Sequence, residues 1–282
     1  PAVAMAYLGE EIEAKSLGMA MGLYISGNSI GGMFGRIISG TLTDFFDWHI
    51  ALLGIGIISL LSSIVFIMLL PPSSHFQPQK LEIKGLATSM LSQFKEPGLI
   101  YLFVIAFLLM GGFVSLYNYI GFQLIAPPYG LSQTLVSFIF VVYIVGTFSS
   151  TWMGMLADQY GRRKILQISL FIFLIGTLIT LHPNLWIKIL GIAVFTFGFF
   201  AGHSIASGWV GKMATHDKAQ AASLYLFSYY AGSSIGGSAG GAFYGQFGWI
   251  GVVTFIVVFA LIAIVVSIRL GWFAKCQRLL VS

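Results

Sequence analysis

The chain has 282 residues, of which 57% are hydrophobic and 15% aromatic, while only 8% are charged. This composition, with a mean hydropathy of +0.92, lies outside the range of soluble domains and predicts an integral membrane protein. The single cysteine, Cys276, excludes a disulfide framework or a thiolate metal cluster built within one chain.

Apolar segments long enough to cross a bilayer recur along the chain. A transmembrane helix needs roughly 20 mostly apolar residues, so we expect an all-α membrane protein with about eight full spans. Residues 1–8 resemble the end of a further span. The eight expected spans cover residues 17–42, 49–70, 98–122, 133–155, 165–182, 186–209, 220–245 and 249–270.

The positive residues predict how these spans are oriented. All of the 14 Lys and Arg residues except Lys188 and Arg36 fall on one side, which the positive-inside rule makes cytoplasmic. The links on the other side carry Trp48, Trp186 and Trp249, which we expect at the membrane interface. The net charge of +5 therefore reflects topology, and its spread among loops argues against nucleic-acid binding.

An internal repeat connects the first and the seventh span. LYISGNSIGGMFG, residues 23–35, recurs as SYYAGSSIGGSAG, residues 228–240, and both copies are expected to open a span. The copies lie six spans apart along the chain, so they run in the same direction and indicate parallel six-helix repeats. Small residues four apart allow close helix packing, either static or movable. The packing glycines are Gly27, Gly31, Gly32, Gly35, Gly232, Gly236, Gly237 and Gly240.

Residues 154–164, GMLADQYGRRK, concentrate charge in one short stretch. The stretch resembles the cytoplasmic-loop signature of the major facilitator superfamily, roughly G-x-L-a-D-[RK]-x-G-R-[RK]. Two six-helix halves joined by a longer cytoplasmic link are that family's architecture. The glycine-rich stretches LYISGNSIGG and SLYLFSYYAGSSIGG further resemble the YnfM-type inner-membrane proteins of the bacterial drug and sugar efflux group.

The resemblance implies a major facilitator fold and an N-terminally truncated chain that begins at the end of helix 4 and contains helices 5 to 12. Residues 1–70 then belong to the N-terminal half, 71–97 form a cytoplasmic linker, 98–270 form the C-terminal half, and 271–282 form a cytoplasmic tail. It also implies a monomer in the bacterial inner membrane that uses no cofactor or metal.

The charged stretch has two interpretations. As a topological anchor, it needs only Gly161 for a tight reversal and Asp158 paired with Arg162, if the helix continues. By the family role, the acid holds a cytoplasmic gate shut by meeting a helix N-terminus of the other half, where Ser16 is the expected N-cap. The family usually has Arg or Lys where this chain has Gln159. The implied gate residues are Gly154, Asp158, Gly161, Arg162, Arg163 and Lys164.

The first glycine-rich copy also resembles the helix-5 motif of proton-driven drug antiporters, G-x-x-x-G-P-x-x-G-G. Gly32 stands in place of the proline, and Arg36 in place of the last glycine. Arg36, whose counterpart in the second copy is Gly241, either extends to the outer interface or faces the cavity and binds an anionic group. No acid lies deep in the eight spans, so we expect any proton-coupling acid in helices outside this chain.

Polar residues within the spans are candidates for a substrate cavity, although each can also be ordinary packing. His203 suits either proton exchange or a structural hydrogen bond. We expect proton-coupled efflux of a small drug-like or sugar-like solute, with proton-coupled uptake of a small nutrient, or a non-transporting scaffold or channel, as alternatives. An enzyme is not expected, because no catalytic constellation or P-loop is found. The cavity candidates are Asn28, Arg36, Tyr117, Asn118, Tyr143, His203, Tyr225, Tyr229 and Tyr230.

Overall fold

The expected all-α fold is confirmed. Every regular element in the described residues of the computed structural model is a helix. The chain forms two compact units, of which unit 1 comprises Pro1–Leu81 and Leu131–Tyr143, and unit 2 comprises Glu82–Gly130 and Ile144–Ser282. The structure describes residues 7, 11, 14–72, 89–94, 96–214 and 216–280.

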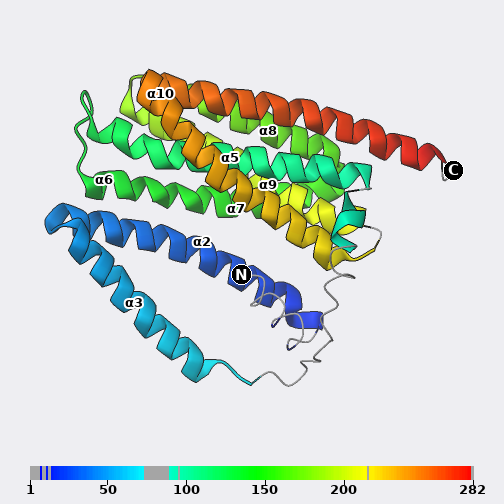
Figure 1. Cartoon of the computed structure of the whole chain (residues 1–282), viewed down its shortest axis with the longest axis horizontal. Helices are drawn as coiled ribbons and strands as arrows, with labels where there is room; N and C mark the ends of the chain where they lie inside the picture. The colour runs from blue at the N-terminus through cyan, green and yellow to red at the C-terminus, as the bar shows by residue number, and fades with distance from the viewer. Residues whose placement is uncertain are drawn as a thin grey trace. The chain divides into compact units, whose positions relative to one another are not determined.

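Unit 1 is built on two long helices, α2 (Ala14–Phe45) and α3 (Trp48–Leu69), which a tight turn joins (Figure 1). Asp47 is the N-cap of α3 and accepts hydrogen bonds from the backbone N–H groups of Ile50 (2.9 Å) and His49 (2.7 Å). These bonds, led by that from Ile50, lower the pKa of the Asp47 carboxyl. The cap thus fixes the point at which the chain turns back.

A second contact in unit 1 fixes the short helix α6 (Gln133–Phe138) against α2. Gly40 lets the two backbones approach, because an added Cβ there would lie 2.5 Å from the Ser137 Cβ. The Asp44 carboxylate accepts bonds from the Thr134 hydroxyl (2.8 Å) and from the backbone N–H of Gln133 (3.3 Å). A 3₁₀ turn, η1 (Ile139–Val142), then follows α6.

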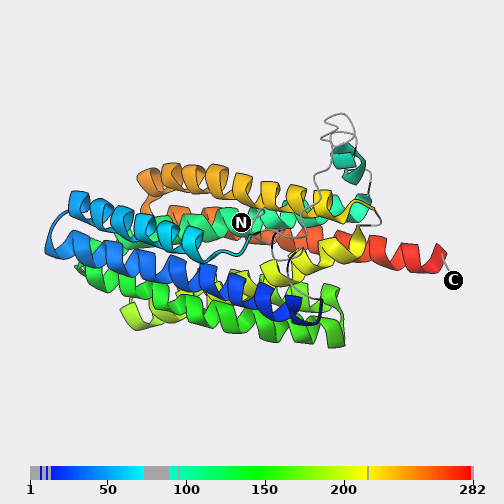
Figure 2. The same cartoon turned by 90° about the horizontal axis from the view of Figure 1, so that it is seen from below.

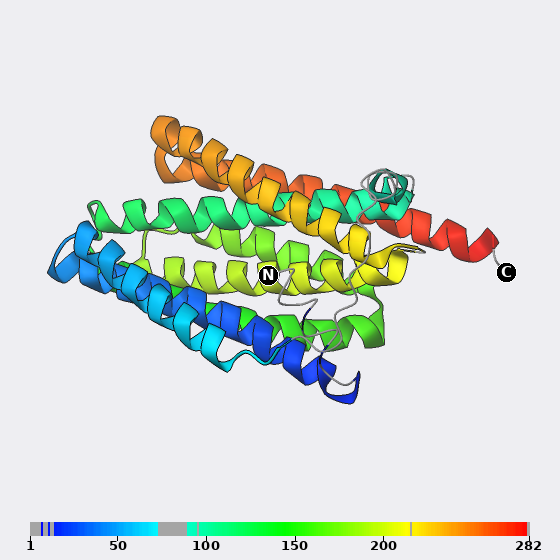
Figure 3. The same ribbon diagram turned by 60° about the horizontal axis from the view of Figure 1, so that its bottom comes forward.

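Within the residues that the structure describes, unit 2 is built on five long helices, besides a short helical stretch at residues 89–93 (Figures 1 and 2). Helix α10 packs along α5 and also against α8, and α9 packs against α8 and α5. At Gly248 (φ 60°, ψ −146°) the backbone of α10 leaves the helical region, and its two parts double back on each other (Figure 3). The five helices are α5 (Pro97–Ile125), α7 (Tyr143–Tyr160), α8 (Arg162–Ile179), α9 (Leu185–Met213) and α10 (Lys218–Leu280).

The helices correspond to the eight expected spans. In the described part of the chain, five helical segments are long and apolar enough to cross a membrane, and the last is two helices divided at Gly248. Helices α2 and α8 match the remaining two spans, and α8 begins with three basic residues. The segments are Trp48–Leu69, Gly98–Ile125, Gln133–Tyr160, Leu185–Met213 and Lys218–Leu270.

Two expectations about helix starts are wrong. The described part of α2 starts at Ala14, and α10 starts at Lys218, so the repeat copies begin at least nine and ten residues inside their helices. Ser16 lies within α2 and is therefore not an N-cap. Strong helix formers precede both copies, in AKSLGMA and KAQAASL, and extend each helix beyond its apolar segment. Residues 1–8, apart from Tyr7, and most of the linker lie outside the described residues.

The three tryptophans expected at the membrane interface differ in how far they are exposed. Trp48 is 58% exposed and Trp186 is 76% exposed, as an interfacial position requires. Trp249, in contrast, is 6% exposed, and its Nε1 donates a hydrogen bond to the Thr180 carbonyl at 3.0 Å. Trp249 thus packs inside unit 2, where its indole N–H has a backbone partner at the end of α8, and its expected depth at the membrane interface stays a prediction.

Lys188, the lysine on the side with few positive charges, is also internal. It is 2% exposed, donates to the same Thr180 carbonyl, and lies 5.6 Å from the Trp249 ring and 5.7 Å from the Tyr129 ring. The aromatic faces and the carbonyl together stabilise its ammonium group. Lys188 therefore packs among helices rather than marking a membrane surface.

Replacing Gly248 tests the break in α10. Gly248→Ala should lower the stability of the purified full-length protein by about 1–2 kcal/mol, because this backbone conformation is almost confined to glycine. Gly245→Ala is the matched control, since its added Cβ would meet nothing within 4 Å in a helical backbone. Thermal unfolding of both variants in detergent measures the difference, and equal stabilities would contradict the assignment of strain to Gly248.

Candidate functional site

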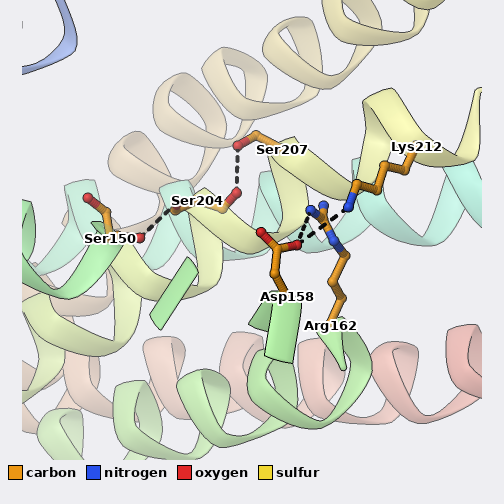
Figure 4. Close-up of polar contacts among 6 residues, drawn as sticks. All are labelled: Ser150, Asp158, Arg162, Ser204, Ser207 and Lys212. Carbon is orange, nitrogen blue, oxygen red and sulfur yellow. Dashed lines mark hydrogen bonds and ion pairs between the residues drawn. The ribbon is translucent and has the colours of Figure 1, made fainter. Parts of the chain in front are cut away.

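A cluster of one acid and two bases lies where α7, α8 and α9 end or begin. Asp158 is in the last turn of α7, and Gly161 (φ 96°) separates it from α8. Arg162 Nη2 donates to Asp158 Oδ1 at 2.8 Å, and Lys212 Nζ of α9 lies 3.4 Å from the same oxygen (Figure 4). The expected pair therefore forms across a helix break rather than along a continuous helix.

The three members of this charge cluster differ in how firmly they are held. The Arg162 side chain is 19% exposed, whereas those of Asp158 and Lys212 are 59% and 65% exposed. An added Cβ at Gly208 would lie 3.2 Å from Arg162 Nη1, so the absence of a side chain on α9 admits the guanidinium. Arg162 is the fixed centre of the cluster, and the two more exposed groups are screened by water.

The remaining residues of the signature stretch lie around this cluster. Among the described residues, Arg163 and Lys164 form no ion pair. Gly154 faces α9, where an added Cβ would lie 3.8 Å from Ser204 Oγ. Ser204 Oγ donates to the Ser150 carbonyl at 3.2 Å, which links α9 to α7 along the same side (Figure 4).

Sequence reasoning missed Lys212, Gly208 and Ser204 as partners. Lys212 was placed on the same membrane face as Asp158 by the charge pattern, which is the one signal that could have suggested the ion pair. The roles of Gly208 and Ser204 depend on how α9 is rotated against its neighbours, which the sequence does not reveal.

The glycines of the second repeat copy lie against α5. An added Cβ would lie 2.2 Å from the Phe107 carbonyl oxygen at Gly232 and 2.5 Å from the Gly111 Cα at Gly236. Ser115 Oγ also donates to the Gly236 carbonyl at 2.9 Å, so the two backbones are in direct contact. Gly237 and Gly240 face the side chains of Val114 and Ser115 in the same way.

The glycines of the first copy have a different environment. An added Cβ at Gly27, Gly31 or Gly35 would meet nothing within 4 Å. At Gly32 the nearest atom would be Arg36 Nη1, 3.7 Å away. The same sequence pattern is therefore packed in one copy and open within its own unit in the other.

Aromatic cavity candidates gather on α9 and α10. His203 Nδ1 lies 2.9 Å from the Tyr225 hydroxyl, and the His203 ring centroid is 4.5 Å from that of Tyr229. Tyr229 meets Tyr230 edge to face at 5.3 Å. Tyr225 is 2% exposed and Tyr230 is 52% exposed, so this aromatic cluster extends from the interior of unit 2 to its surface.

The other candidates are distributed between the units. In unit 2, Tyr117 is 7% exposed and hydrogen-bonds the Thr196 hydroxyl at 2.7 Å, which is a packing contact between α5 and α9, whereas Asn118 is exposed. In unit 1, Asn28 and Arg36 are exposed on α2, and Tyr143 is buried. Within the described residues there is no group of three His, Cys, Asp or Glu that could hold a metal.

The unequal burial of the cluster predicts unequal effects of mutation. Arg162→Gln should lower the apparent Tm of the full-length protein by about 2–4 °C, because it removes the least exposed member of the cluster. Lys212→Gln should have a smaller effect, and Arg163→Gln, one residue along, is the control expected to leave Tm unchanged. Thermal unfolding at low and high salt measures this order; equal effects of Arg162→Gln and Arg163→Gln would contradict it.

Comparison with known proteins places the chain in a family. The Major Facilitator Superfamily model matches residues 1–125 and 113–274. An uncharacterized MFS-type transporter of Bacillus subtilis, YybF, is 52% identical over 279 residues, which cover 99% of this chain and 68% of YybF. The inner membrane transport protein YnfM of Escherichia coli is 48% identical over 269 residues, covering 95% of this chain and 64% of YnfM.

The chain thus spans about two thirds of the length of these relatives. Among solved structures, a bacterial homologue of the human lysosomal transporter Spinster, in an inward-facing and unoccupied conformation, has a TM-score of 0.64 at 15% identity. That match covers 95% of this chain and 74% of the other, and shows a common fold. Sequence and fold agree: this chain belongs to the major facilitator superfamily.

Proposed function

We propose that the full-length protein is a secondary active transporter that exports a small drug-like or sugar-like solute across the bacterial inner membrane in exchange for protons. The observation that carries the proposal is the 48% identity to YnfM, an inner membrane transport protein, over 95% of this chain. The glycine-rich first copy, with its likeness to the antiporter motif, supports export over uptake. The absence of a P-loop pattern from this sequence favours coupling to an ion gradient over ATP.

The charge cluster supports a gating role within this function. Arg162 and Lys212 both contact Oδ1 of Asp158, and the side chain is 59% exposed, so Oδ2 can accept a bond from another element. A carboxylate is stabilised by the free N–H groups and positive dipole end of a helix. Asp158 is proposed to close the cytoplasmic gate by meeting the first turn of α2 in one conformational state only.

The aromatic cluster supports binding of a partly apolar solute. His203, Tyr229 and Tyr230 present ring faces and polar edges, which bind such solutes by stacking and hydrogen bonding. Tyr230, at 52% exposure, is the accessible end of this cluster, while Tyr225 holds the His203 ring by its hydroxyl.

Transport itself is tested in everted membrane vesicles that contain the full-length protein. Solutes such as ethidium and arabinose are added singly, and solute-dependent release of protons from acid-loaded vesicles is the expected result for an exported substrate. Vesicles without the protein are the control. Solute movement that persists after an ionophore has collapsed the proton gradient contradicts proton exchange. Solute movement only out of the everted vesicles, which corresponds to movement into the cell, supports uptake instead of export.

Gating is tested with Asp158→Asn. The substitution should shift the protein roughly fivefold toward the inward-open state, since the contact of the carboxylate with α2 is made only when the gate is closed. Two single-cysteine variants, each in a Cys276→Ser background, report access from the two ends of unit 2 by their alkylation rates. One cysteine replaces Ser207, near the C-terminal end of α9, and the other replaces Gln123, in the last turn of α5.

Arg163→Gln serves as the control for this gating test, because it removes a charge from the first turn of α8 without touching Asp158. If Asp158→Asn leaves both alkylation rates unchanged in correctly inserted protein, the charged stretch is a topological anchor and the gating proposal fails.

A further inference from the structure

Arg36 lies far inside α2 and points away from the nearer end of the helix. It is nine residues before Phe45, the last residue of α2, which places it about 14 Å from that end. Its Nη1 donates to the carbonyl of Gly32, one turn further from Phe45, at 3.3 Å. An arginine that extends to the interface directs its charge toward the nearest helix end. The contact with Gly32 therefore argues against that interpretation.

Two aromatic rings border the Arg36 guanidinium. Its Cζ lies 4.8 Å from the centre of the Phe140 ring and 5.9 Å from that of Tyr143. These residues are three apart where the chain follows the 3₁₀ turn η1, and side chains at that spacing align on one face of a 3₁₀ helix. The η1 turn thus presents both rings to the same face of α2.

No acid neutralises this charge among the residues that the structure describes. The described carboxylates nearest in the chain, Asp44 and Asp47, accept bonds at the starts of α6 and α3 instead. Within the described residues, the polar and ring contacts of Arg36 are with the Gly32 carbonyl and the two rings, so most of its five N–H donors are not used there. An uncompensated cation at membrane depth is costly, and such residues characteristically face a cavity or pathway.

The second repeat copy cannot carry an equivalent group. Its counterpart of Arg36 is Gly241, where an added Cβ would lie 2.5 Å from the Tyr119 hydroxyl. Beside Arg36, by contrast, an added Cβ at Gly35 would meet nothing within 4 Å. The cation is thus confined to the copy that is open within its own unit.

We propose that Arg36, flanked by Phe140 and Tyr143, binds the carboxylate or phosphate group of a small organic anion that the protein transports. A guanidinium binds either group through two parallel N–H···O bonds, and the rings hold its plane while contacting the apolar part of the solute. This inference rests on the proposed transport function and defines the chemical class of its substrate.

The first experiment measures whether position 36 faces an aqueous cavity and needs no substrate. The full-length protein in nanodiscs, in the Cys276→Ser background, carries Arg36→Cys or, as the matched control, Phe34→Cys on another face of the same turn. Phe34 is 53% exposed and apolar, as a lipid-facing residue is. A negatively charged, water-soluble methanethiosulfonate should react at least tenfold faster with Arg36→Cys. Equal or slower reaction overturns the inference.

The second experiment measures recognition of charge. Thermal unfolding of the full-length protein is followed with benzoate, gluconate and phenyl phosphate, and with the neutral partners benzamide, glucose and phenol. At least one anion should raise the Tm of the wild type where its neutral partner does not. Arg36→Gln should abolish that shift, Arg36→Lys should retain part of it, and Arg163→Gln should leave it intact.

The outcomes separate this inference from the transport proposal. An anion shift that survives Arg36→Gln, or a wild type that no anion stabilises selectively, overturns the inference even if the protein transports neutral solutes. If no anion stabilises the wild type selectively and Arg36→Gln has a lower Tm without ligand, Arg36 instead pairs with a carboxylate of another helix. Anion binding that depends on Arg36, without any solute movement in vesicles, contradicts the transport proposal alone.

Discussion

A chain within hydrocarbon must satisfy its backbone N–H and C=O groups internally, and the rest of this structure depends on that constraint. The described backbone is helical over almost its whole length, and two of the sharp breaks between membrane-spanning segments occur at glycines with positive φ, Gly161 and Gly248. Polar side chains complete the exposed helix starts. Asp47 and Asn184 accept bonds from the first turns of α3 and α9.

The same requirement separates structural polar residues from functional ones. Ser169 and Thr177 return their hydroxyl protons to carbonyls four residues earlier, and they are fully buried. Such groups have no bonding capacity that a solute needs to fill. Arg36 and Asp158 differ, because each retains donors or an acceptor oxygen beyond its contacts in the described residues. Unused bonding capacity, rather than polarity alone, therefore identifies the candidates for function.

The sequence predicted the spans, the family and the Asp158–Arg162 pair because each depends on local composition or a short motif. It did not predict Lys212 as a partner of Asp158 or the burial of Trp249, since both depend on how neighbouring helices are rotated. The limits of the helices were missed for another reason. Hydropathy shows only how long the apolar segment of a helix is, whereas favourable helix formers extend α2 and α10 beyond their apolar segments. The 3₁₀ turn at Ile139–Val142 has no distinctive composition, so its alignment of Phe140 with Tyr143 was not foreseen.

One backbone oxygen ties together three elements at the far end of unit 2 from the charge cluster. The Thr180 carbonyl, at the C-terminal end of α8, accepts from both Lys188 of α9 and Trp249 of the second part of α10. Because that end of a helix carries a partial negative charge, the lysine is held there by attraction as well as by geometry. The three helices are consequently joined at this end through a single acceptor, and a displacement of the Thr180 carbonyl would disturb both bonds at once.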